Sequence, residues 1–442
     1  MEKQFKKGFF EFIAAADAEK VHSQTIGWIF SNDCDVFSNE EKNTILNELL
    51  SIKNEEIDLI PTKVDVEIND IDILITCGDR WLVVIENKIK SSQHSNQLYK
   101  YEYITSPDLH TALKLYKKWK SIEFPDENFE SEYLKSNIKV QKELILNWEK
   151  KQDIKIKDII HQDEELEYRN HSCKYVYLTL VKEKPESSNW KNITYSDLYK
   201  VLDKYFKNKN IPNVENHSIV KSYLKTIGNL SRVTELFIES PSNFKFVFTE
   251  GKTIKGGYIE SETDKGTAKS YIKYLGLETL LQKWFYSNLL ERIKIKEEDE
   301  GLLDYKKCII GETNGTALFD FHFNKITIDN KIYTPILQFQ SNAIKLALAG
   351  DSDKEKPDDS DKKELITQRK DIFVEKLKNS DTFKQLKNIE IKLSTPKKSE
   401  GFISININQK SEDGRFWQFY ENPHEFVFKK IKLAQEIFKE IK

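Results

Sequence analysis

The segment Ile71–Lys90 has the sequence IDILITCGDRWLVVIENKIK and decides how the first part of the chain folds. Its two apolar runs flank Gly78-Asp79, a pair of residues typical of a hairpin turn. The second run ends in the triplet Glu-Asn-Lys at 86–88, although burying charged side chains without a partner costs free energy. The segment therefore predicts a β-hairpin with charged groups at one end that something must neutralise.

The length of the turn decides which side chains share a face of this hairpin. We expect a three-residue loop, Cys77 to Asp79, which pairs position 76 with position 80 and places Asp72 opposite Val84. Gly78 supplies the positive φ that such a bulged turn requires, whereas a two-residue loop would turn Asp72 away from the charged triplet. Because side chains alternate along a strand, one face then carries Asp72, Leu74, Thr76, Leu82, Val84, Glu86 and Lys88.

Two carboxylates that converge from neighbouring strands form a site for a hard cation. Asp72 and Glu86, with Asn87 next to them, supply the oxygen ligands that Mg²⁺ or Mn²⁺ prefers. Such a cation lowers the pKa of a bound water and neutralises the charge that develops on a phosphodiester. Lys88 is placed to hold that water or to stabilise the transition state. The alternative is a surface cluster of salt bridges, which would not require strongly apolar strands around it.

Two flanking helices carry side chains at helical spacing that suit the same site. Glu19, His22 and Ser23 share one face of a helix, so the Glu19 carboxylate can complete the metal shell. The alternatives are that Glu19 pairs with a lysine and that His22 is a hydrogen-bonded core histidine. Gln97 and Tyr101 are four residues apart on the next helix, where Gln97 can contact a ligand of the metal or a phosphate. A polar and an aromatic residue on a packed helix would give the same pattern.

Lysines and aromatic residues after the hairpin predict a track for nucleic acid. Lys90, Lys100 and Tyr101 are the nearest candidates, because lysines neutralise phosphates and aromatic rings stack on bases. The alternative is that these lysines simply face water on the surface of helices. The same mixture continues through Tyr99, Tyr103, Lys114, Tyr116, Lys117, Lys118, Trp119 and Lys120.

Together these motifs resemble the PD-(D/E)XK nuclease superfamily, in particular its bacterial branch with a helical Glu-x-x-His-Ser motif and a Gln-x-x-x-Tyr helix. The matching segments are Glu19–Ser23, Ile71–Ile75, Glu86–Lys88 and Gln97–Tyr101. The likeness covers about the first 235 residues and leaves no position of the motifs empty. It implies that Asp72 and Glu86 bind the metal, that Lys88 assists the attacking water, and that the N-terminal helix can add a carboxylate.

The composition limits the class of protein and the number of domains. A chain of 442 residues is too long for one ordinary core, which favours two domains. Basic and acidic residues nearly cancel, 69 against 72, so an anionic partner needs a local basic patch. The four cysteines form no Cys-x-x-Cys pair, which favours a reducing cytoplasm over a disulfide framework or a zinc site. The apolar run FFEFIAAA at 9–16 contains Glu11 and is too short to cross a membrane.

We expect a domain boundary between residues 236 and 237. The order helix, strands, helix, strand, helix in 1–236 predicts an α/β domain, and the resemblance implies a restriction-endonuclease-like mixed sheet flanked by helices. The charged segment at about 123–170 is expected to be an inserted helical region. Residues 237–442 are expected to form an α+β domain of the target- or partner-recognition type, in which the charged stretch 351–364 is a solvated loop.

The periodicity of apolar residues also places the individual elements. Helices are expected at 9–30, 39–52, 92–104 and 271–293, with further helices ending near 236. Besides the hairpin, a strand is expected at 174–180, and strands of mostly antiparallel hairpins are expected at 316–323, 325–339, 401–407 and 414–420. The last of these carries exposed-strand aromatic residues that suit recognition, or that form the core of a small sheet: Phe416, Trp417, Phe419 and Tyr420.

The sequence as a whole predicts an enzyme, a Mg²⁺-dependent phosphodiesterase that cleaves DNA. The resemblance places such an enzyme in bacterial defence against foreign DNA, with a protein partner from the same defence system and homo-oligomerisation as further expectations. One alternative is a non-catalytic module that uses the same fold to hold nucleic acid or a protein. Another is a nuclease that acts on RNA, since nothing in the sequence recognises the 2′-hydroxyl. No membrane partner is expected, and the expected location is the cytoplasm.

Overall fold

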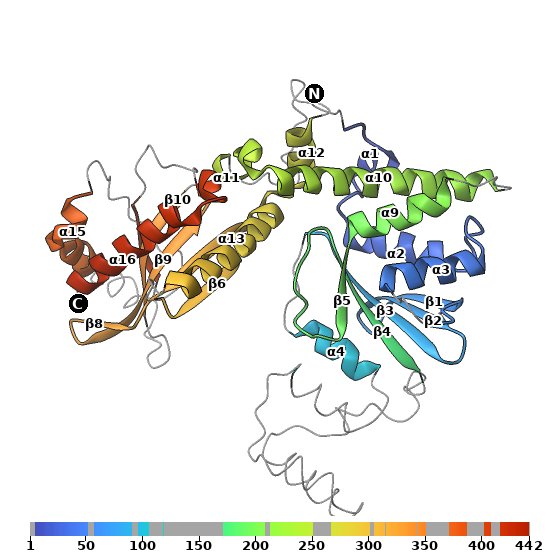
Figure 1. The fold of residues 1–442 in the computed structure, drawn as a ribbon, viewed down its shortest axis with the longest axis horizontal. Coiled ribbons are helices and arrows are strands. Elements are labelled where there is room, and N and C mark those ends of the chain that lie inside the picture. The colour runs from blue at the N-terminus through green and yellow to red at the C-terminus, as the bar shows by residue number, and fades with distance from the viewer. Residues whose placement is uncertain are drawn as a thin grey trace, which may run out of the picture. The chain divides into compact units, whose positions relative to one another are not determined.

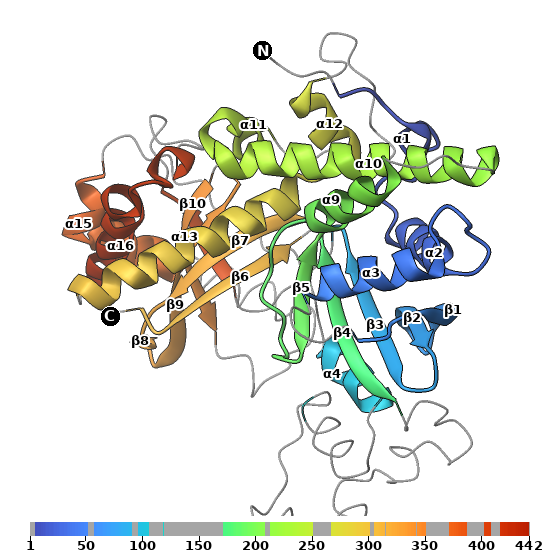
Figure 2. The ribbon, with the colours of Figure 1, turned by 45° about the vertical axis from the view of Figure 1, so that its right-hand side comes forward.

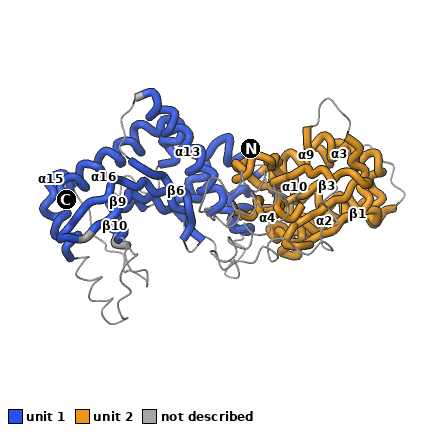
Figure 3. The backbone as a smooth tube through the Cα atoms, turned by 90° about the horizontal axis from the view of Figure 1, so that it is seen from below, with its two compact units in different colours: residues 1–5, 233–442 blue, residues 6–232 orange. Residues whose placement is uncertain are grey.

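The computed structural model divides into two compact units, Lys6–Arg232 and Met1–Phe5 with Val233–Lys442 (Figure 3). The division falls within helix α10 (Val214–Glu239), close to the expected boundary after residue 236. The segments expected as an insertion and as a solvated loop lie outside the described residues. The structure describes residues 5–51, 57–90, 96–105, 118, 171–207, 213–250, 267–300, 305–313, 315–341, 343–350, 371–386, 402–407 and 416–441.

The unit Lys6–Arg232 is built on a five-stranded mixed sheet in the order β1-β2-β3-β4-β5 (Figures 1 and 2). The first three strands are antiparallel, and β3, β4 and β5 run parallel to one another. The parallel strands require long crossovers, which is why the hairpin partners are close in sequence and β4 is not. The strands are β1 (Pro61–Ile68), β2 (Ile71–Cys77), β3 (Trp81–Lys88), β4 (Ser172–Thr179) and β5 (Trp190–Thr194).

Helices cover both faces of this sheet. The helices among the described residues of the unit are α1 (Phe9–Phe12), α2 (Glu19–Phe30), α3 (Asn39–Leu50), α4 (Gln97–Ile104), α9 (Tyr195–Phe206) and the larger part of α10. On one face, side chains of α2, α3 and α9 surround a small apolar void over Val83 and Ile85 of β3. On the other face, Leu98 and Tyr101 of α4 pack with Val84. The side chains of β3 therefore alternate between two buried layers, and a polar residue on either face needs an internal partner.

The single helix expected at 9–30 is wrong, because the chain turns between α1 and α2. Ala14 has a left-handed backbone conformation with φ +56°, which ends the first helix. Glu11 is fully buried, and its carboxylate accepts hydrogen bonds from Thr226 Oγ1 at 2.6 Å and Asn229 Nδ2 at 2.9 Å on α10. The short α1 is thereby held against α10, and α2 starts afresh at Glu19.

The hairpin has the expected three-residue loop, but the loop is shifted by one residue. It comprises Gly78–Arg80, so the register brings Asp72 level with Glu86 rather than with Val84. Gly78 has φ +55°, as the bulged turn requires. Since the loop has an odd number of residues in either register, the expected assignment of side chains to faces is unchanged.

The second unit is built on a six-stranded antiparallel sheet in the order β11-β10-β9-β7-β6, with β8 paired to β9. Its helices include α11 (Phe246–Thr249), α12 (Ala268–Leu275), α13 (Glu278–Glu300), α15 (Asp381–Lys384) and α16 (Lys429–Glu440). Aromatic side chains of α13 and β7 stack in the core, with the rings of Tyr286 and Phe319 5.3 Å apart. The strands are β6 (Lys307–Thr313), β7 (Thr316–His322), β8 (Ile326–Ile328), β9 (Lys331–Gln340), β10 (Ala343–Gly350) and β11 (Phe402–Asn406).

Two expected elements of the second unit are wrong. The helix expected at 271–293 is two helices, because Gly276 takes the left-handed conformation that ends α12. The strand expected at 414–420 is a 3₁₀ turn, Phe416–Phe419, and its aromatic residues serve the core. Phe416 is 2% exposed and lies edge-on to Phe248, with ring centroids 4.8 Å apart. Among the described residues, none of the helices has both the length and the apolar character that crossing a bilayer requires.

Candidate active site

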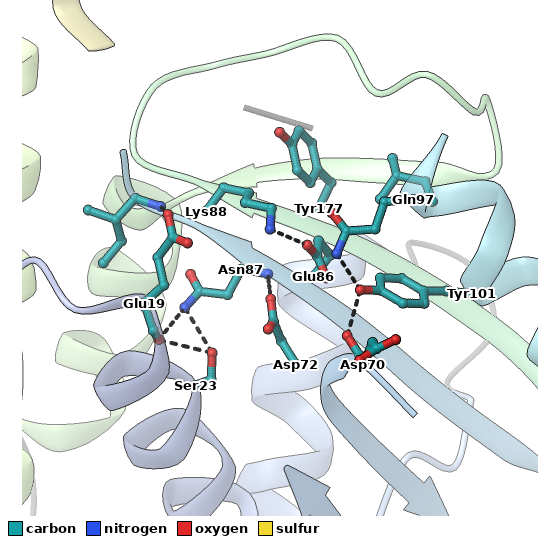
Figure 4. Close-up of polar contacts among 12 residues, drawn as sticks. Glu19, Ser23, Asp70, Asp72, Glu86, Asn87, Lys88, Gln97, Tyr101 and Tyr177 are labelled. Atoms are coloured by element: carbon teal, nitrogen blue, oxygen red, sulfur yellow. Dashed lines mark hydrogen bonds and ion pairs between the residues drawn. The ribbon is translucent and has the colours of Figure 1, made fainter. Parts of the chain in front are cut away.

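The charged residues of the hairpin meet at one end of the mixed sheet, on the face covered by α4 (Figure 4). Asp72 lies near the start of β2, and Glu86 and Lys88 lie at the end of β3. Because the two strands are antiparallel, the start of one and the end of the other are neighbours. The three residues that the sequence assigned to one face are thus brought together by the register of the hairpin.

Glu86 is the most unusual side chain of this group. It is completely buried, and neither of its carboxylate oxygens has a hydrogen-bond partner in the described part of the chain. Lys88 Nζ lies 2.6 Å from Glu86 Oε1 and forms an ion pair with it. Asp72 is better satisfied, since its Oδ2 accepts a hydrogen bond of 2.7 Å from the main-chain N–H of Asn87. The buried carboxylate of Glu86 pairs with the Lys88 ammonium, and the half-buried carboxylate of Asp72 is close enough to interact with the same charge.

The electrostatics show that this cluster lacks positive charge. Burial, together with the nearby Asp72, raises the pKa of Glu86 to about 8. Burial also raises the pKa of Asp72. Burial lowers the pKa of Lys88, but the carboxylates of Glu86, Asp72 and Glu19 outweigh this effect and raise it, so the ammonium stays charged. A cation at Asp72 and Glu86 would remove the cost that burial places on the two carboxylates.

Helix α4 adds a second set of polar groups to the same face. Gln97 Nε2 donates a hydrogen bond to Tyr101 Oη, which in turn donates to the carbonyl oxygen of Asp70. Gln97 Oε1 is buried and has no hydrogen-bond partner among the described residues. Burial, with Glu86 close by, raises the pKa of Tyr101, so its hydroxyl remains a donor. The amide of Gln97 is thus oriented by Tyr101 and keeps an acceptor free for a ligand.

The loop between β4 and β5 holds α4 in this position. Glu186 Oε1 accepts a hydrogen bond of 2.9 Å from the main-chain N–H of Leu98, at the first turn of the helix. Glu102 of the same helix accepts from Asn189 Nδ2 at 2.7 Å and from Trp190 Nε1 at 2.9 Å. These contacts join residues that are 87 or 88 positions apart in the chain, so no short sequence motif predicts them.

Glu19 lies at the site but is directed at the main chain. Its Oε1 accepts hydrogen bonds from the N–H groups of Ile89 at 2.9 Å and Lys90 at 3.2 Å, just beyond the end of β3. The carboxylate therefore caps the strand that carries Glu86 and Lys88. It is near enough to Lys88 to raise that residue's pKa, so its charge acts on the cluster.

Asn87 does not join the expected metal ligands through its side chain. It alternates to the opposite face of β3, where it is completely buried. Its Nδ2 donates to the carbonyl oxygen of Glu19 at 3.0 Å and to Ser23 Oγ at 3.1 Å, and its Oδ1 accepts from Tyr195 Oη at 2.6 Å. The amide is thus fully used in holding α2 and α9 to the strand. Tyr195 was not among the residues expected from the sequence.

His22 is a hydrogen-bonded core residue, the alternative left open for it. Its Nε2 lies 3.0 Å from the carbonyl oxygen of Ala16, so this nitrogen carries the hydrogen. Its Nδ1 then accepts from Tyr223 Oη at 3.1 Å. Burial lowers the pKa of His22 to about 4, which keeps the ring neutral. The histidine of the Glu-x-x-His-Ser segment therefore packs α2 rather than serving as a metal ligand or a base.

The residues expected to bind nucleic acid are mostly occupied by other contacts. Lys90 forms an ion pair with Asp17, and Lys100 forms one with Asp70. Tyr101 is 0% exposed, so its ring cannot stack on a base in this structure. Of the other residues of the track, Tyr99 contacts Lys118 Nζ, 5.0 Å from its ring centroid, and Tyr103 is buried. Lys114, Tyr116, Lys117, Trp119 and Lys120 lie outside the described residues.

The donor set suits a magnesium-type cation. No group of three or more histidine, cysteine, aspartate or glutamate side chains within the described ranges forms a ready metal cage. Mg²⁺ does not need one, because it commonly binds through one or two carboxylates and fills its other positions with water and substrate phosphates. Glu86, with two buried oxygens that lack hydrogen bonds, and Asp72, with one oxygen already held, fit this mode.

No protein-family model, curated protein or solved structure matches this chain. The fold class is nonetheless defined by the structure: an α/β unit with a five-stranded mixed sheet, and a second unit with an antiparallel sheet and helices.

Proposed function

We propose that this chain is a metal-dependent nuclease of the PD-(D/E)XK type that hydrolyses phosphodiester bonds of DNA. The observation that carries the proposal is the buried carboxylate of Glu86, which lacks a hydrogen bond and lies beside a second carboxylate and one lysine. A structural salt bridge would match its charges and satisfy its oxygens. A site with excess buried negative charge is what a divalent cation stabilises.

The environment of each residue indicates its role in the proposed reaction. Asp72 and Glu86 would hold Mg²⁺ or Mn²⁺, which when bound supplies an activated water and offsets charge on the phosphate. Lys88 stays protonated, so it orients the water or donates to a phosphate oxygen rather than removing a proton. Gln97 offers a buried acceptor, fixed by Tyr101, to a water or to another ligand of the cation.

The fold is consistent with this assignment. A mixed sheet in which an antiparallel hairpin carries the acidic residues, with helices on both faces, is the arrangement that a restriction-endonuclease-like fold requires. As part of the same proposal, the protein acts in the cytoplasm in bacterial defence against foreign DNA, together with a protein partner or as a homo-oligomer. The second unit, which holds none of these residues, would select the target or the partner.

The test compares two neighbouring aspartates in a cleavage assay with Mn²⁺ and with EDTA. Asp72→Asn should abolish Mn²⁺-dependent cleavage of plasmid and linear DNA, a loss of at least about 100-fold, because a preorganised charge is removed. Asp70→Asn is the matched control, since the exposed Asp70 pairs with Lys100 and its carbonyl contact to Tyr101 is unaffected. Asparagine also tolerates the positive φ of position 70.

Three outcomes would contradict the proposal in different ways. Equal cleavage by both variants would place the chemistry elsewhere in the chain. Binding of DNA without cleavage by the wild-type protein would support a non-catalytic module on the same fold. Cleavage of RNA but not of DNA in the same assay would support the metal site but would show that the substrate is RNA.

A further inference from the structure

Asn87 lies between Glu86 and Lys88 on β3, and its polar groups contact three other elements of the unit. Its main-chain N–H donates to Asp72 Oδ2 on β2 at 2.7 Å. Its Nδ2 reaches α2, at the carbonyl oxygen of Glu19 and at Ser23 Oγ. Its Oδ1 accepts from Tyr195 Oη at the start of α9, 108 residues further along the chain. A single buried residue therefore links the end of β3 that carries Glu86 and Lys88 to β2, α2 and α9.

The direction of the Asn87 amide follows from its partners. The carbonyl oxygen of Glu19 can only accept, so the NH₂ group of Asn87 must face α2. The amide oxygen then faces Tyr195, whose hydroxyl donates at 2.6 Å. Without this donor, the buried amide oxygen would lose the one partner that it has among the described residues, and the amide would be free to turn or shift.

The anchor of this hydrogen bond is rigid. Tyr195 is 0% exposed and is the first residue of α9, directly after β5. The preceding Thr194 caps the helix, with its Oγ1 accepting from the main-chain N–H of Asp197 at 3.2 Å. The ring of Tyr195 stands edge-on to His22, with centroids 5.3 Å apart. The hydroxyl is therefore fixed by packing and by the helix cap before it meets Asn87.

We propose that Tyr195 is a positioning residue of the metal site, which acts through the Asn87 amide. By holding that amide, it sets the main chain of Asn87 against Asp72 and keeps Glu86 and Lys88 in register with it. Glu19 is tied to the same amide through its carbonyl oxygen. Supporting contacts of this kind hold ligands within a fraction of an ångström of the geometry that a cation needs. The inference rests on the proposed metal-dependent function of Asp72 and Glu86.

Tyr223 provides a close control for this role. It is also 0% exposed, and its hydroxyl donates a hydrogen bond to His22 Nδ1 at 3.1 Å. Its ring lies 5.5 Å from that of His22, much as Tyr195 does. The hydroxyl of Tyr223 also interacts with that of Tyr195, but the bond to Asn87 is made by Tyr195. Tyr223→Phe thus removes an equally buried hydroxyl from the same cluster and leaves the Asn87 amide bonded.

The experiment measures Mn²⁺ binding directly, by calorimetric titration of the full-length protein without DNA. Tyr195→Phe should weaken the affinity for Mn²⁺ by about 10- to 100-fold, as loss of a supporting partner does, and Tyr223→Phe should change it less than about threefold. Both variants should lower the melting temperature by similar amounts, because each loses one buried hydrogen bond. Raising Mn²⁺ should restore cleavage in Tyr195→Phe, which a general loss of folding would not allow.

Each result bears on a different claim. Equal Mn²⁺ affinity in the two phenylalanine variants would overturn the positioning role of Tyr195 and leave the metal site standing. Absence of Mn²⁺ binding in the wild-type protein would overturn the proposed function, and this inference with it. If Tyr195→Phe does not fold, Ser23→Ala takes its place, because it removes an acceptor of the same amide. Unchanged Mn²⁺ affinity in Ser23→Ala would then overturn the inference.

Discussion

Glu86 in the mixed sheet and Asp320 in the antiparallel sheet are both buried carboxylates, and they differ in what surrounds them. Each has at least one oxygen without a hydrogen-bond partner among the described residues. Burial raises the pKa of both, to about 8 for Glu86 and about 6 for Asp320. Asp320 is offset by Gln338 and Lys345, whereas Glu86 has a second carboxylate, Asp72, beside it. A single buried carboxylate, as at Asp320, therefore does not indicate a metal site, whereas two carboxylates close together, as at Glu86 and Asp72, do.

The position within each sheet reinforces this difference. Asp320 lies in β7, and the register places it in a row across three neighbouring strands with Gln338 of β9 and Lys345 of β10. Such a row lets acid, amide and amine offset one another inside the sheet. Glu86 lies near the end of β3, where the register places Asp72 of β2 on one side of it and Tyr177 of β4 on the other. The comparison therefore predicts that equivalent changes at the two carboxylates have different consequences.

The largest expected effect is on catalysis. Glu86→Gln should lower metal-dependent DNA cleavage by about 1,000-fold or more, because the charge that holds the cation is lost. Asp320→Asn is the matched change in the other unit and should leave cleavage per folded molecule within about twofold. Initial rates at saturating Mn²⁺ measure both. A comparable loss of rate in Asp320→Asn would show that the antiparallel sheet takes part in the chemistry.

The next effect is on stability in the absence of metal, and its sign follows from the raised pKa values. A carboxyl with a raised pKa keeps its proton in the folded state while the unfolded state has lost it, so stability falls as pH rises between the two values. For Glu86 this window runs from about 4.5 to about 8, and for Asp320 from about 3.8 to about 6. Glu86→Gln should therefore stabilise the metal-free protein above pH 8, by at most about 5 kcal/mol, because each pKa unit of this window corresponds to about 1.4 kcal/mol.

Urea unfolding in EDTA at several pH values measures this difference. Below pH 4.5, Glu86→Gln and the wild-type protein should have nearly the same free energy of unfolding. Asp320→Asn should show a smaller gain that is complete by about pH 6. If the stability of Glu86→Gln followed the wild-type protein at every pH, the buried cluster would already be neutralised by a group other than a metal.

The sequence predicted the faces of the hairpin more securely than its register. Strict alternation assigns Asp72, Glu86 and Lys88 to one face for any odd loop. The shift of one residue in the turn therefore left the predicted faces unchanged. The order of strands and helices likewise follows from local periodicity. The strands β5, β6 and β10 were not anticipated; β5 has only five residues, and the apolar residues of β6 form one short run, Cys308–Ile310, between polar ends.

Contacts between distant segments could not be predicted in this way. Nothing local indicates that Tyr195 would meet Asn87, or that Tyr101 would be buried by packing with Trp190. Alternation does place Asn87 on the face opposite to Glu86, so a stricter use of the strand pattern would have removed its side chain from the expected ligands. The aromatic residues at 416–420 have strand propensity, but packing against Phe248 and Phe285 makes them a 3₁₀ turn.

A weaker effect is expected at Glu19, a carboxylate of the first unit that accepts main-chain hydrogen bonds just beyond β3. Glutamine at position 19 can still accept the hydrogen bonds from Ile89 and Lys90 through its amide oxygen, so the cap on β3 is kept while the negative charge is lost. If that charge assists the cation, Glu19→Gln should weaken Mn²⁺ binding by about 10- to 100-fold with little change in stability.

Glu102→Gln is the control, because Glu102 is a buried carboxylate of the same unit whose two oxygens are already bonded by Asn189 and Trp190. This variant should lose some stability, because the NH₂ group of glutamine cannot accept a hydrogen bond and one of the two donors loses its partner, and it should bind Mn²⁺ normally once folded. Calorimetric titration separates the two cases. Wild-type affinity in Glu19→Gln would show that Glu19 only caps the strand, and the metal would then be held by Asp72 and Glu86 alone among the carboxylates of the described site.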